Sequence, residues 1–395
     1  MVQILDSTLR EGEQTPGVYF SPDSKLIIAR LLDELGVDII EAGNPMVDDE
    51  IAQSITMIAH EGLRAKVGAH SRCRIDDVKK ALHCGVNFIG IFLSVSEQRL
   101  KYDYNITLDE AITQITDVIR YARTQSDNLL IRYTAEDAVR SPIDNVLKAS
   151  IAATEAGANI ISIADTTGYS NPFKEGRKIS DYVRILKTEL SKKGLHPKIA
   201  VHCHNDRGLA LANALDAYKA GADIIDATVL RLGERTGIVD LAELLMNFRD
   251  GFEEGLHWRL GILKDLYELV SEYARIPIPC NQPVTGKNAF THCSGLHIRA
   301  LRRDPWLYQS IDPALFDRRW QITLGVQSGR AAVELALERI GRFDVVDNKD
   351  LVGAIVKEIK AIAKRGRPID IEEEFPAIVE RCERDNNFGR CHTKY

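Results

Sequence analysis

Two short stretches, far apart in the sequence, carry residue types that bind divalent metal ions. Residues 6–14 (DSTLREGEQ) follow an apolar run and contain Glu11, and residues 202–206 (HCHND) contain histidines at i and i+2. Side chains two positions apart on a strand point to the same face. A carboxylate with two neutral imidazoles suits Zn²⁺, Mn²⁺ or a similar ion, or Mg²⁺ if water and substrate oxygens complete its shell. We therefore predict that Glu11, His202 and His204 form a metal site with open positions.

Open positions on such an ion would suit a bidentate ligand, such as the carboxylate and carbonyl oxygens of a 2-oxo acid. The ion would polarise the ketone as a Lewis acid. Arg10 could donate to the same ketone oxygen as negative charge develops on it. The alternatives are a salt bridge at the barrel end for Arg10 and a helix cap or surface carboxylate for Glu11.

A second group of candidate residues lies further along the chain, in residues 286–297 (GKNAFTHCSGLH). His292 and His297 flank a Ser-Gly turn there, and Tyr308 follows eleven residues later. A histidine and a tyrosine on a mobile segment near a polarised ketone could transfer protons. The alternative is a surface loop with ordinary histidines.

The elements that must position these residues alternate between strand and helix. Apolar, β-rich runs occur at residues 2–6, 37–41, 65–69, 88–93, 129–134, 160–164, 199–202 and 224–228. Helical patterns lie between them, for example over 21–35, 108–124 and 143–156. This alternation predicts parallel strands with right-handed crossovers. Eight such units in about 250 residues predict an α/β fold, a closed (β/α)8 TIM barrel. The alternative, a doubly wound sheet, lacks a G-x-G-x-x-G motif after the first strand.

The repeat stops near residue 255, so we predict a catalytic barrel over residues 1–255. Residues 256–395 would form a linker and a small mixed, mainly helical C-terminal region that contributes to a dimer and to the active site. A helix is predicted over 253–275, and the prolines within 276–283 exclude helix there. Further helices are predicted at residues 331–340 and 349–364.

Composition and charge narrow the class of protein. The chain has 395 residues, 45% of them hydrophobic and 27% charged, which is ordinary for a globular protein. A net charge of −6 without a long basic run argues against nucleic acid or a membrane surface as partner. No stretch approaches the ~18 uninterrupted apolar residues that would span a bilayer. Seven cysteines without CxxC spacing indicate free thiols and a reducing, cytoplasmic location.

Reactive groups in a TIM barrel lie at the C-terminal ends of the strands. The predicted strand ends carry many polar side chains: Arg10, Glu11, Glu41, His70, Ser94, Ser96, Arg132, Thr134, Glu136, Asp165, Thr166, His202, His204 and Thr228. A single polar residue at the start of a loop is common. The whole group, however, indicates an active site on one rim of the barrel.

Four motifs, in this order, resemble the α-alkylmalate synthases, the Claisen-condensing branch of the metal-dependent TIM-barrel lyase/synthase superfamily. This branch includes isopropylmalate, citramalate and homocitrate synthases, and homocitrate synthase is the nearest resemblance. The motifs are residues 6–14 (DSTLREGEQ), 202–206 (HCHND), 232–237 (LGERTG) and 290–297 (FTHCSGLH). The resemblance runs from residue 2 to about residue 335.

The resemblance implies an acyltransferase reaction in which acetyl-CoA loses a methyl proton and the enolate attacks the ketone of a 2-oxo acid. Hydrolysis of the thioester then gives a 2-hydroxy di- or tricarboxylate and CoA. The matching positions imply metal ligation by Glu11, His202 and His204, ketone polarisation by Arg10, carboxylate binding by Thr166, and general-base catalysis by His297 with assistance from Glu136 and Tyr308. In this family the segment with the base crosses a dimer interface, so a homodimer is implied.

The resemblance to homocitrate synthases favours 2-oxoglutarate as the oxo acid and homocitrate as the product. Those enzymes have Arg and Ser at the positions of Arg132 and Thr134, where they hold the distal carboxylate, and His70 matches their Thr-His-x-x-Cys stretch. A guanidinium can pair with a carboxylate through two charge-assisted hydrogen bonds. The alternative is that Arg132 pairs with an internal acid such as Glu41 or Asp137.

Other substrates and activities stay open from the sequence. Many relatives have an asparagine at the position of Ile238, whereas homocitrate synthases also have an apolar residue there. Ile238 therefore argues against isopropylmalate synthesis. Residues 41–45 (EAGNP) resemble the wider family more than lysine-pathway homocitrate synthases, which keeps citramalate, isopropylmalate and benzylmalate (from phenylpyruvate) open. A lyase of the hydroxymethylglutaryl-CoA type is a further alternative, and the segment with His292 and His297 argues against it. A non-catalytic relative that binds metabolites is another, and the complete set of polar residues argues against that.

Overall fold

The computed structural model describes residues 1–366 and 369–392. The chain divides into two compact units, Met1–Ile278 and Pro279–Tyr395, whose boundary lies inside the proline-containing segment predicted as a linker. The first unit extends beyond the barrel end predicted at residue 255, because helix α10 (Leu263–Ala274) packs against α1 (Pro22–Leu35) and belongs to it.

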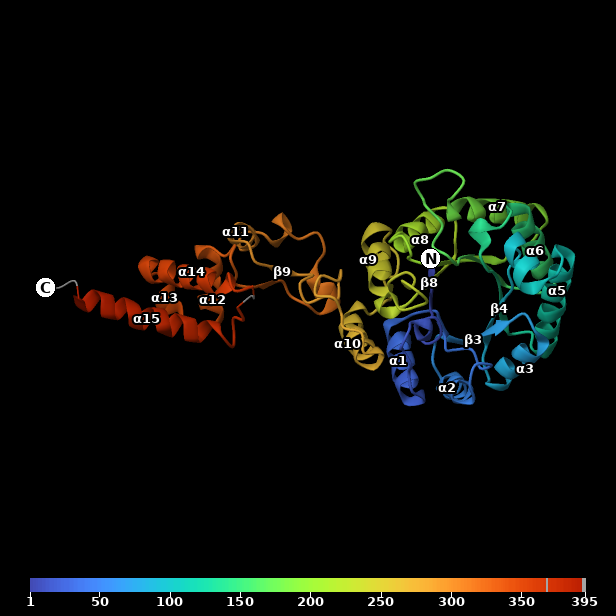
Figure 1. Ribbon diagram of the computed structural model, residues 1–395, viewed down its shortest axis with the longest axis horizontal. Coiled ribbons are helices and arrows are strands. Elements are labelled where there is room, and N and C mark those ends of the chain that lie inside the picture. Colours follow the sequence, from blue (N-terminus) through green and yellow to red (C-terminus); the bar gives the residue numbers. More distant parts are fainter. Residues whose placement is uncertain (367–368, 393–395) are drawn as a thin grey trace. The chain divides into compact units, whose positions relative to one another are not determined.

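The first unit is a closed barrel of eight parallel strands in sequential order, with helices around the outside (Figure 1). The strands are β1 (Gln3–Asp6), β2 (Ile39–Glu41), β3 (Lys66–Arg72), β4 (Phe88–Phe92), β5 (Leu130–Ala135), β6 (Ile160–Asp165), β7 (Lys198–Cys203) and β8 (Ile224–Ala227). Strand β1 pairs with both β2 and β8, which closes the sheet. The predicted (β/α)8 fold is therefore confirmed.

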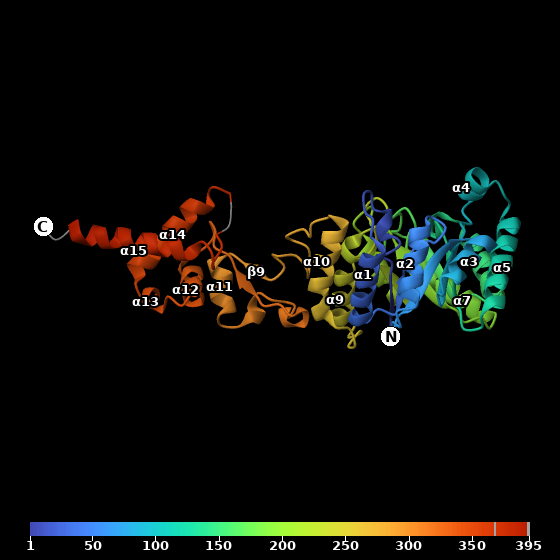
Figure 2. The same cartoon turned by 90° about the horizontal axis from the view of Figure 1, so that it is seen from below.

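The helices that follow the strands begin and end close to the predicted ranges. Besides α1 and α10 they are α2 (Asp49–Ala59), α3 (Ile75–His83), α4 (Glu97–Arg99), α5 (Leu108–Gln125), α6 (Ile143–Glu155), α7 (Ile179–Lys192), α8 (Ala210–Lys219) and α9 (Leu241–Gly251). Ser21 caps α1 by accepting a hydrogen bond from the Ser24 amide, and Pro22 takes the first helical position. The short α4 stands out at the end of the barrel away from the N-terminus (Figure 2).

One predicted helix, over residues 253–275, is wrong in its first half. Glu253 and Gly255 adopt φ of 54° and 69°, which a right-handed helix does not allow. Only a short turn at Leu260–Ile262 precedes α10. The chain uses the non-helical stretch to pass from α9 to α10.

The interior of the barrel has two layers of different character. The layer nearer the N-terminal ends of the strands is apolar and consists of Leu5, Ile39, Phe88, Ile160, Ala200 and Ile224, with Leu130 packed against them. Two residues further along the strands, the inward positions are occupied by Ser7, Glu41, Gly90, Arg132, Ser162, His202 and Asp226. Because side chains alternate along a strand, this polar layer lies directly above the apolar one. The apolar layer supports a group of buried charges.

The second unit is mainly helical, as predicted. Its helices are α11 (Gly295–Leu301), α12 (Arg330–Arg339), α13 (Phe343–Val346), α14 (Lys349–Ala363) and α15 (Phe375–His392), and β9 (Thr291–His292) pairs with β10 (Gln321–Ile322) in parallel. Its apolar core includes the fully buried Leu337, Ile355 and Phe375. Within the described parts of both units, none of the helices has the length and apolar character needed to cross a membrane.

Candidate active site

A cavity of about 590 Å³ opens at the C-terminal ends of the barrel strands. Nine of the fourteen strand-end residues selected from the sequence line it: Arg10, Glu11, His70, Arg132, Thr134, Glu136, Thr166, His202 and His204. The other five, Glu41, Ser94, Ser96, Asp165 and Thr228, are not part of its lining. Asp226, which the strand-end analysis did not select, lines it as well. With Gly43 after β2 and Phe92 at the end of β4, the lining draws residues from the ends of all eight strands.

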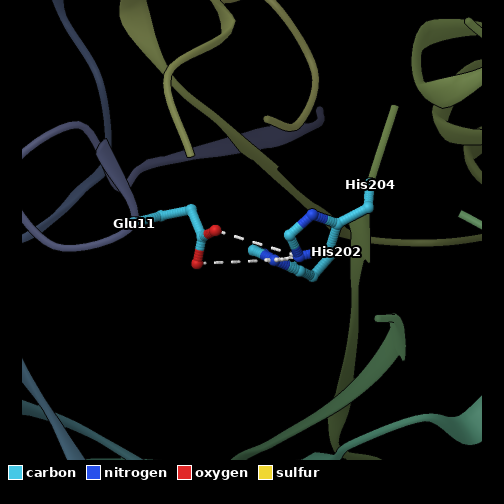
Figure 3. Close-up of side chains that lie close together, drawn as sticks. All are labelled: Glu11, His202 and His204. Carbon is cyan, nitrogen blue, oxygen red and sulfur yellow. Dashed lines mark hydrogen bonds and ion pairs between the residues drawn. The ribbon is translucent and has the colours of Figure 1, made fainter. Parts of the chain in front are cut away.

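Glu11, His202 and His204 converge in this cavity from opposite ends of the barrel sequence. Glu11 follows β1, His202 lies in β7, and His204 follows β7, so the carboxylate faces the two rings (Figure 3). The His202 Nε2 atom lies 4.0 Å from Glu11 Oε2, and His204 Nε2 lies 3.8 Å from Glu11 Oε1. The two Nε2 atoms are 3.3 Å apart. All three residues are buried and offer ligand atoms within 4.8 Å of one another, so they could hold a divalent metal ion.

Arg10 and Glu11 form a buried ion pair, with Arg10 NH1 2.5 Å from Glu11 Oε2. Burial alone would raise the pKa of the Glu11 carboxyl, but Arg10 and the two histidines outweigh it and lower the pKa overall. Burial likewise opposes the charge of Arg10, whereas Glu41 and Glu11 raise its pKa above the usual value. Both groups therefore stay charged, which their predicted roles as metal ligand and as donor to a ketone oxygen require.

Glu41 joins the charged side chains of the polar layer. Its Oε2 accepts hydrogen bonds from Arg10 Nε (2.5 Å) and Ser7 Oγ (3.0 Å), and its Oε1 accepts one from Arg132 NH2 (2.7 Å). His70 Nδ1 lies 3.1 Å from the same Oε1. Although burial raises the pKa of the Glu41 carboxyl, Arg10 and Arg132 hold it well below its usual range.

His70 is a neutral member of the same group. Burial, followed by the charge of Arg10, lowers the pKa of His70 to about 4. Its ring stacks on Phe92, with centroids 4.6 Å apart and an interplanar angle of 10°. His70 therefore offers the cavity a hydrogen-bonding ring without a charge.

Arg132 pairs with internal acids, as one of the two sequence interpretations required. Its NH2 group donates to Glu41 Oε1 at 2.7 Å, and its NH1 group donates to both oxygens of Asp226, Oδ2 at 3.1 Å and Oδ1 at 3.3 Å. Asp137, the other acid considered, is bound instead by Arg140 at 2.7 Å. Arg132 Nε and Thr134 Oγ1 are buried without a partner in the described part of the chain. Arg132 is thus fixed by the protein and still keeps an unused donor.

Glu136 is held by two residues of the segment that follows β4. Its Oε1 lies 2.9 Å from Arg99 NH2, and its Oε2 accepts a hydrogen bond from Tyr104 at 3.2 Å. Burial raises the pKa of the Glu136 carboxyl, although Arg99 opposes the shift. Thr166 Oγ1 accepts a hydrogen bond from the Asp137 amide at 2.8 Å, which leaves its own proton available to a ligand.

His297 and Tyr308 belong to the second unit, where they contact each other. Their rings stack with centroids 4.0 Å apart, and His292 lies edge-on to His297 at 6.2 Å. The structure thus groups the two residues that the resemblance assigns to proton transfer. Their action on the barrel cavity stays a prediction.

Sequence analysis missed several residues of the site, among them Asp226, Arg99 and Tyr104. Asp226 lies two positions before Thr228, which was selected as a strand end. The alternation of side chains along β8 would have placed Asp226 inside the barrel. Arg99 and Tyr104 lie beyond the strand end, in α4 and the turn Leu100–Tyr104, where no strand pattern points to them.

Comparison with protein families assigns the class of this barrel. Residues 1–263 match the HMGL-like family, and residues 284–367 match the family described as homocitrate synthase post-HMGL domain-like. The chain therefore belongs to the HMGL-like family and carries the additional domain of its synthase branch. The structure of the hydroxymethylglutaryl-CoA lyase from Pseudomonas aeruginosa shares the fold, with a TM-score of 0.59 and 19% identity, over 69% of this chain and 92% of that one.

Curated relatives with named activities are similar over most of the chain. The homocitrate synthase of Pyrococcus abyssi is 39% identical, over 91% of this chain and 94% of that protein. The homocitrate synthase AksA of Methanocaldococcus jannaschii is 38% identical, over 98% and 92%. A probable 2-isopropylmalate synthase of Ignicoccus hospitalis is 35% identical, over 96% and 92%. The chain is thus a member of the homocitrate and isopropylmalate synthase family.

Proposed function

We propose that this protein condenses acetyl-CoA with 2-oxoglutarate and hydrolyses the thioester to homocitrate and CoA. The observation that carries the proposal is the presence, in one cavity, of Glu11 with two histidines and of Arg132 and Thr134 with unused buried polar atoms. The first group suits the 2-oxo acid end of the substrate, and the second suits its distal carboxylate. The similarity to several homocitrate synthases supports the same substrate.

The charges around the cavity fit an anionic ligand. Glu11, Glu41 and Asp226 face Arg10 and Arg132, so the group has one formal negative charge in excess. A divalent ion would change this to one positive charge. An interior of low dielectric favours ligands that compensate such a charge. The charge balance therefore favours an anionic oxo acid, and the preference for a dianionic one rests on the unused polar atoms of Arg132 and Thr134.

The barrel residues would bind and polarise the oxo acid. A divalent metal ion held by Glu11, His202 and His204 would supply Lewis-acid polarisation of the ketone. Arg10 would stabilise the ketone oxygen as it gains negative charge, and Thr166 would donate to the adjacent carboxylate. Arg132 and Thr134 would hold the distal carboxylate.

Proton transfer would come from the second unit. His297 would take the methyl proton of acetyl-CoA, with Tyr308 stacked on its ring and Glu136 assisting. The enolate carbon then attacks the ketone carbon, and water cleaves the thioester to release CoA. We infer a homodimer in which one chain's His297 serves the other chain's barrel, as the family resemblance implies.

A second candidate is 2-isopropylmalate synthesis. The similarity to the Ignicoccus hospitalis protein supports it, and so do the apolar side chains of Val18, Val47 and Ile51 in the cavity lining. The branched 2-oxoisovalerate lacks a distal carboxylate and would leave Arg132 Nε without a partner. Because an unmet buried donor is costly, we place this candidate second.

Release of thiol from acetyl-CoA tests the proposal directly. The assay compares 2-oxoglutarate, 2-oxoisovalerate, pyruvate and phenylpyruvate with Mg²⁺, Mn²⁺ or Zn²⁺ added to the full chain. We expect the highest kcat/KM with 2-oxoglutarate. Faster turnover of 2-oxoisovalerate would favour the second candidate, and cleavage of hydroxymethylglutaryl-CoA would favour a lyase. Binding of oxo acids with no thiol release would point to a non-catalytic relative.

A further inference from the structure

Asp226 connects the candidate metal site to the arginine that faces the oxo acid. It occupies an inward position of β8, is 1% exposed, and belongs to none of the sequence motifs that indicate the function. Its Oδ2 lies 3.1 Å from His202 Nδ1 and 3.1 Å from Arg132 NH1. Its Oδ1 accepts a second hydrogen bond from the same NH1 at 3.3 Å.

We propose that Asp226 is a positioning residue that fixes His202 for metal binding, and that Arg132 holds Asp226 in place. The inference rests on the proposed metal site. A carboxylate only accepts hydrogen bonds, so the ring nitrogen that faces it must carry the imidazole proton. The proton of neutral His202 then lies on Nδ1, and the lone pair lies on Nε2. That lone pair is on the side of the ring that faces Glu11 and His204.

The strand register places these groups side by side. Ala200 of β7 pairs with Ile224 of β8, so His202 and Asp226 lie two residues further along neighbouring strands on the same inward face. Neither residue depends on a loop for its position. The geometry of the pair is therefore set by the sheet itself.

Arg132 limits the freedom of the Asp226 carboxylate. Two hydrogen bonds to one guanidinium nitrogen restrict rotation of the carboxylate, and the opposite nitrogen of Arg132 is held by Glu41 at 2.7 Å. The connection from Glu41 through Arg132 and Asp226 to His202 is buried throughout. Hydrogen bonds among charged groups are strong in such surroundings.

The two histidines are not equivalent in this respect. His204 Nδ1 is buried and has no hydrogen-bond partner within the part of the chain described. Its tautomer is therefore not set by a neighbouring carboxylate. The orientation of the metal site depends on His202, and a change at Asp226 acts through that ring.

Metal titration of the full-length, metal-stripped protein tests the inference without an activity measurement. In Asp226→Asn, the amide can turn its NH2 group towards His202 Nδ1 and move the ring proton to Nε2. We expect the Kd for Zn²⁺ or Co²⁺, from calorimetry, to rise about 10–100-fold. Asp240→Asn is the matched control, since Asp240 is equally buried and accepts from Tyr267 instead of a histidine. Its Kd should equal that of the wild type.

An unchanged Kd in Asp226→Asn would overturn the inference while leaving the metal site intact. If wild type bound metal no better than Glu11→Gln, the metal site itself and the proposed function would fail. NMR of histidine-¹⁵N-labelled wild type provides a test that does not depend on folding of Asp226→Asn. With His202→Gln to assign the signals, we expect the Nδ1-protonated tautomer of His202, and the Nε2-protonated tautomer would overturn the inference.

Discussion

Replacing Arg132 by glutamine should both destabilise the barrel and impair binding of the distal carboxylate. Arg132 is 1% exposed and pairs with two buried carboxylates, Glu41 and Asp226. Breaking a buried ion pair by removing one partner costs about 3–5 kcal/mol. Glu41 keeps Arg10 and Ser7 as partners. We therefore expect the free energy of unfolding to fall by about 3 kcal/mol, at the lower end of the range for a broken buried pair.

The catalytic effect of Arg132→Gln should depend on the substrate. A hydrogen bond to a charged group contributes about 1.5–3 kcal/mol, so kcat/KM for 2-oxoglutarate should fall roughly 10–150-fold. Pyruvate has no distal carboxylate, and its kcat/KM should fall much less. Arg132→Lys keeps the charge without the planar fork and should give intermediate values for both stability and kcat/KM.

Urea unfolding followed by circular dichroism and thiol release measure the two effects separately. The double variant Arg132→Gln, Asp226→Asn also removes the carboxylate that loses its guanidinium partner, and it should recover part of the lost stability. Additive losses in the double variant would refute the coupling between the two residues. A stability loss below ~1 kcal/mol in Arg132→Gln would refute the buried network, because a surface salt bridge costs no more than that. Equal losses of kcat/KM for pyruvate and 2-oxoglutarate would remove Arg132 from carboxylate binding.

Three further predictions follow from particular side chains. His297→Ala should lower kcat about 10²–10⁴-fold while the Kd for the oxo acid, measured by calorimetry, is preserved, and unchanged turnover would exclude His297 as the base. His70 has a pKa of about 4 in the folded protein and 6.5 in a model peptide, so its contribution to stability is complete above pH 6.5 and is lost as the pH falls towards 4. The shift corresponds to about 3 kcal/mol, and denaturation of metal-free His70→Gln between pH 4 and 7 should show a correspondingly flatter slope than the wild type. Gly90→Ala would place a Cβ 3.1 Å from Glu41 Oε1 and 3.2 Å from Arg132 NH2, so we expect about 1–3 kcal/mol of destabilisation in urea together with weaker binding of 2-oxoglutarate. Wild-type stability in Gly90→Ala would show that the polar layer can move aside.

The barrel could be predicted from the sequence because each strand is a short apolar run with its own local signals. The break in the helix predicted over 253–275 could not be predicted, because Glu253 is not a residue type that favours positive φ. Its backbone follows the path from α9 to α10 instead of a local preference. The break is therefore imposed by packing and leaves little trace in the sequence.

The candidate site could be predicted as a set of residues but not as a network. Strand ends identify Glu11, His202 and Arg132, because parallel strands end on one rim. The sequence does not say which acid crosses the barrel interior to meet Arg132. That choice depends on strand register and tilt, which place Glu41 and Asp226 there and leave Asp137 with Arg140.

The position of this network inside the barrel explains how the site can be rigid and charged together. Burying charges costs free energy unless each is paired, and every carboxylate of the polar layer contacts a guanidinium or an imidazole. The pairs are carried by strands above a closely packed apolar layer, so they cannot relax towards solvent. Polar groups held this way need no reorganisation when charge develops on a ketone oxygen. Burying Arg10, Arg132 and Asp226 costs the barrel stability, and the result is a site whose polar groups are already arranged for the reaction.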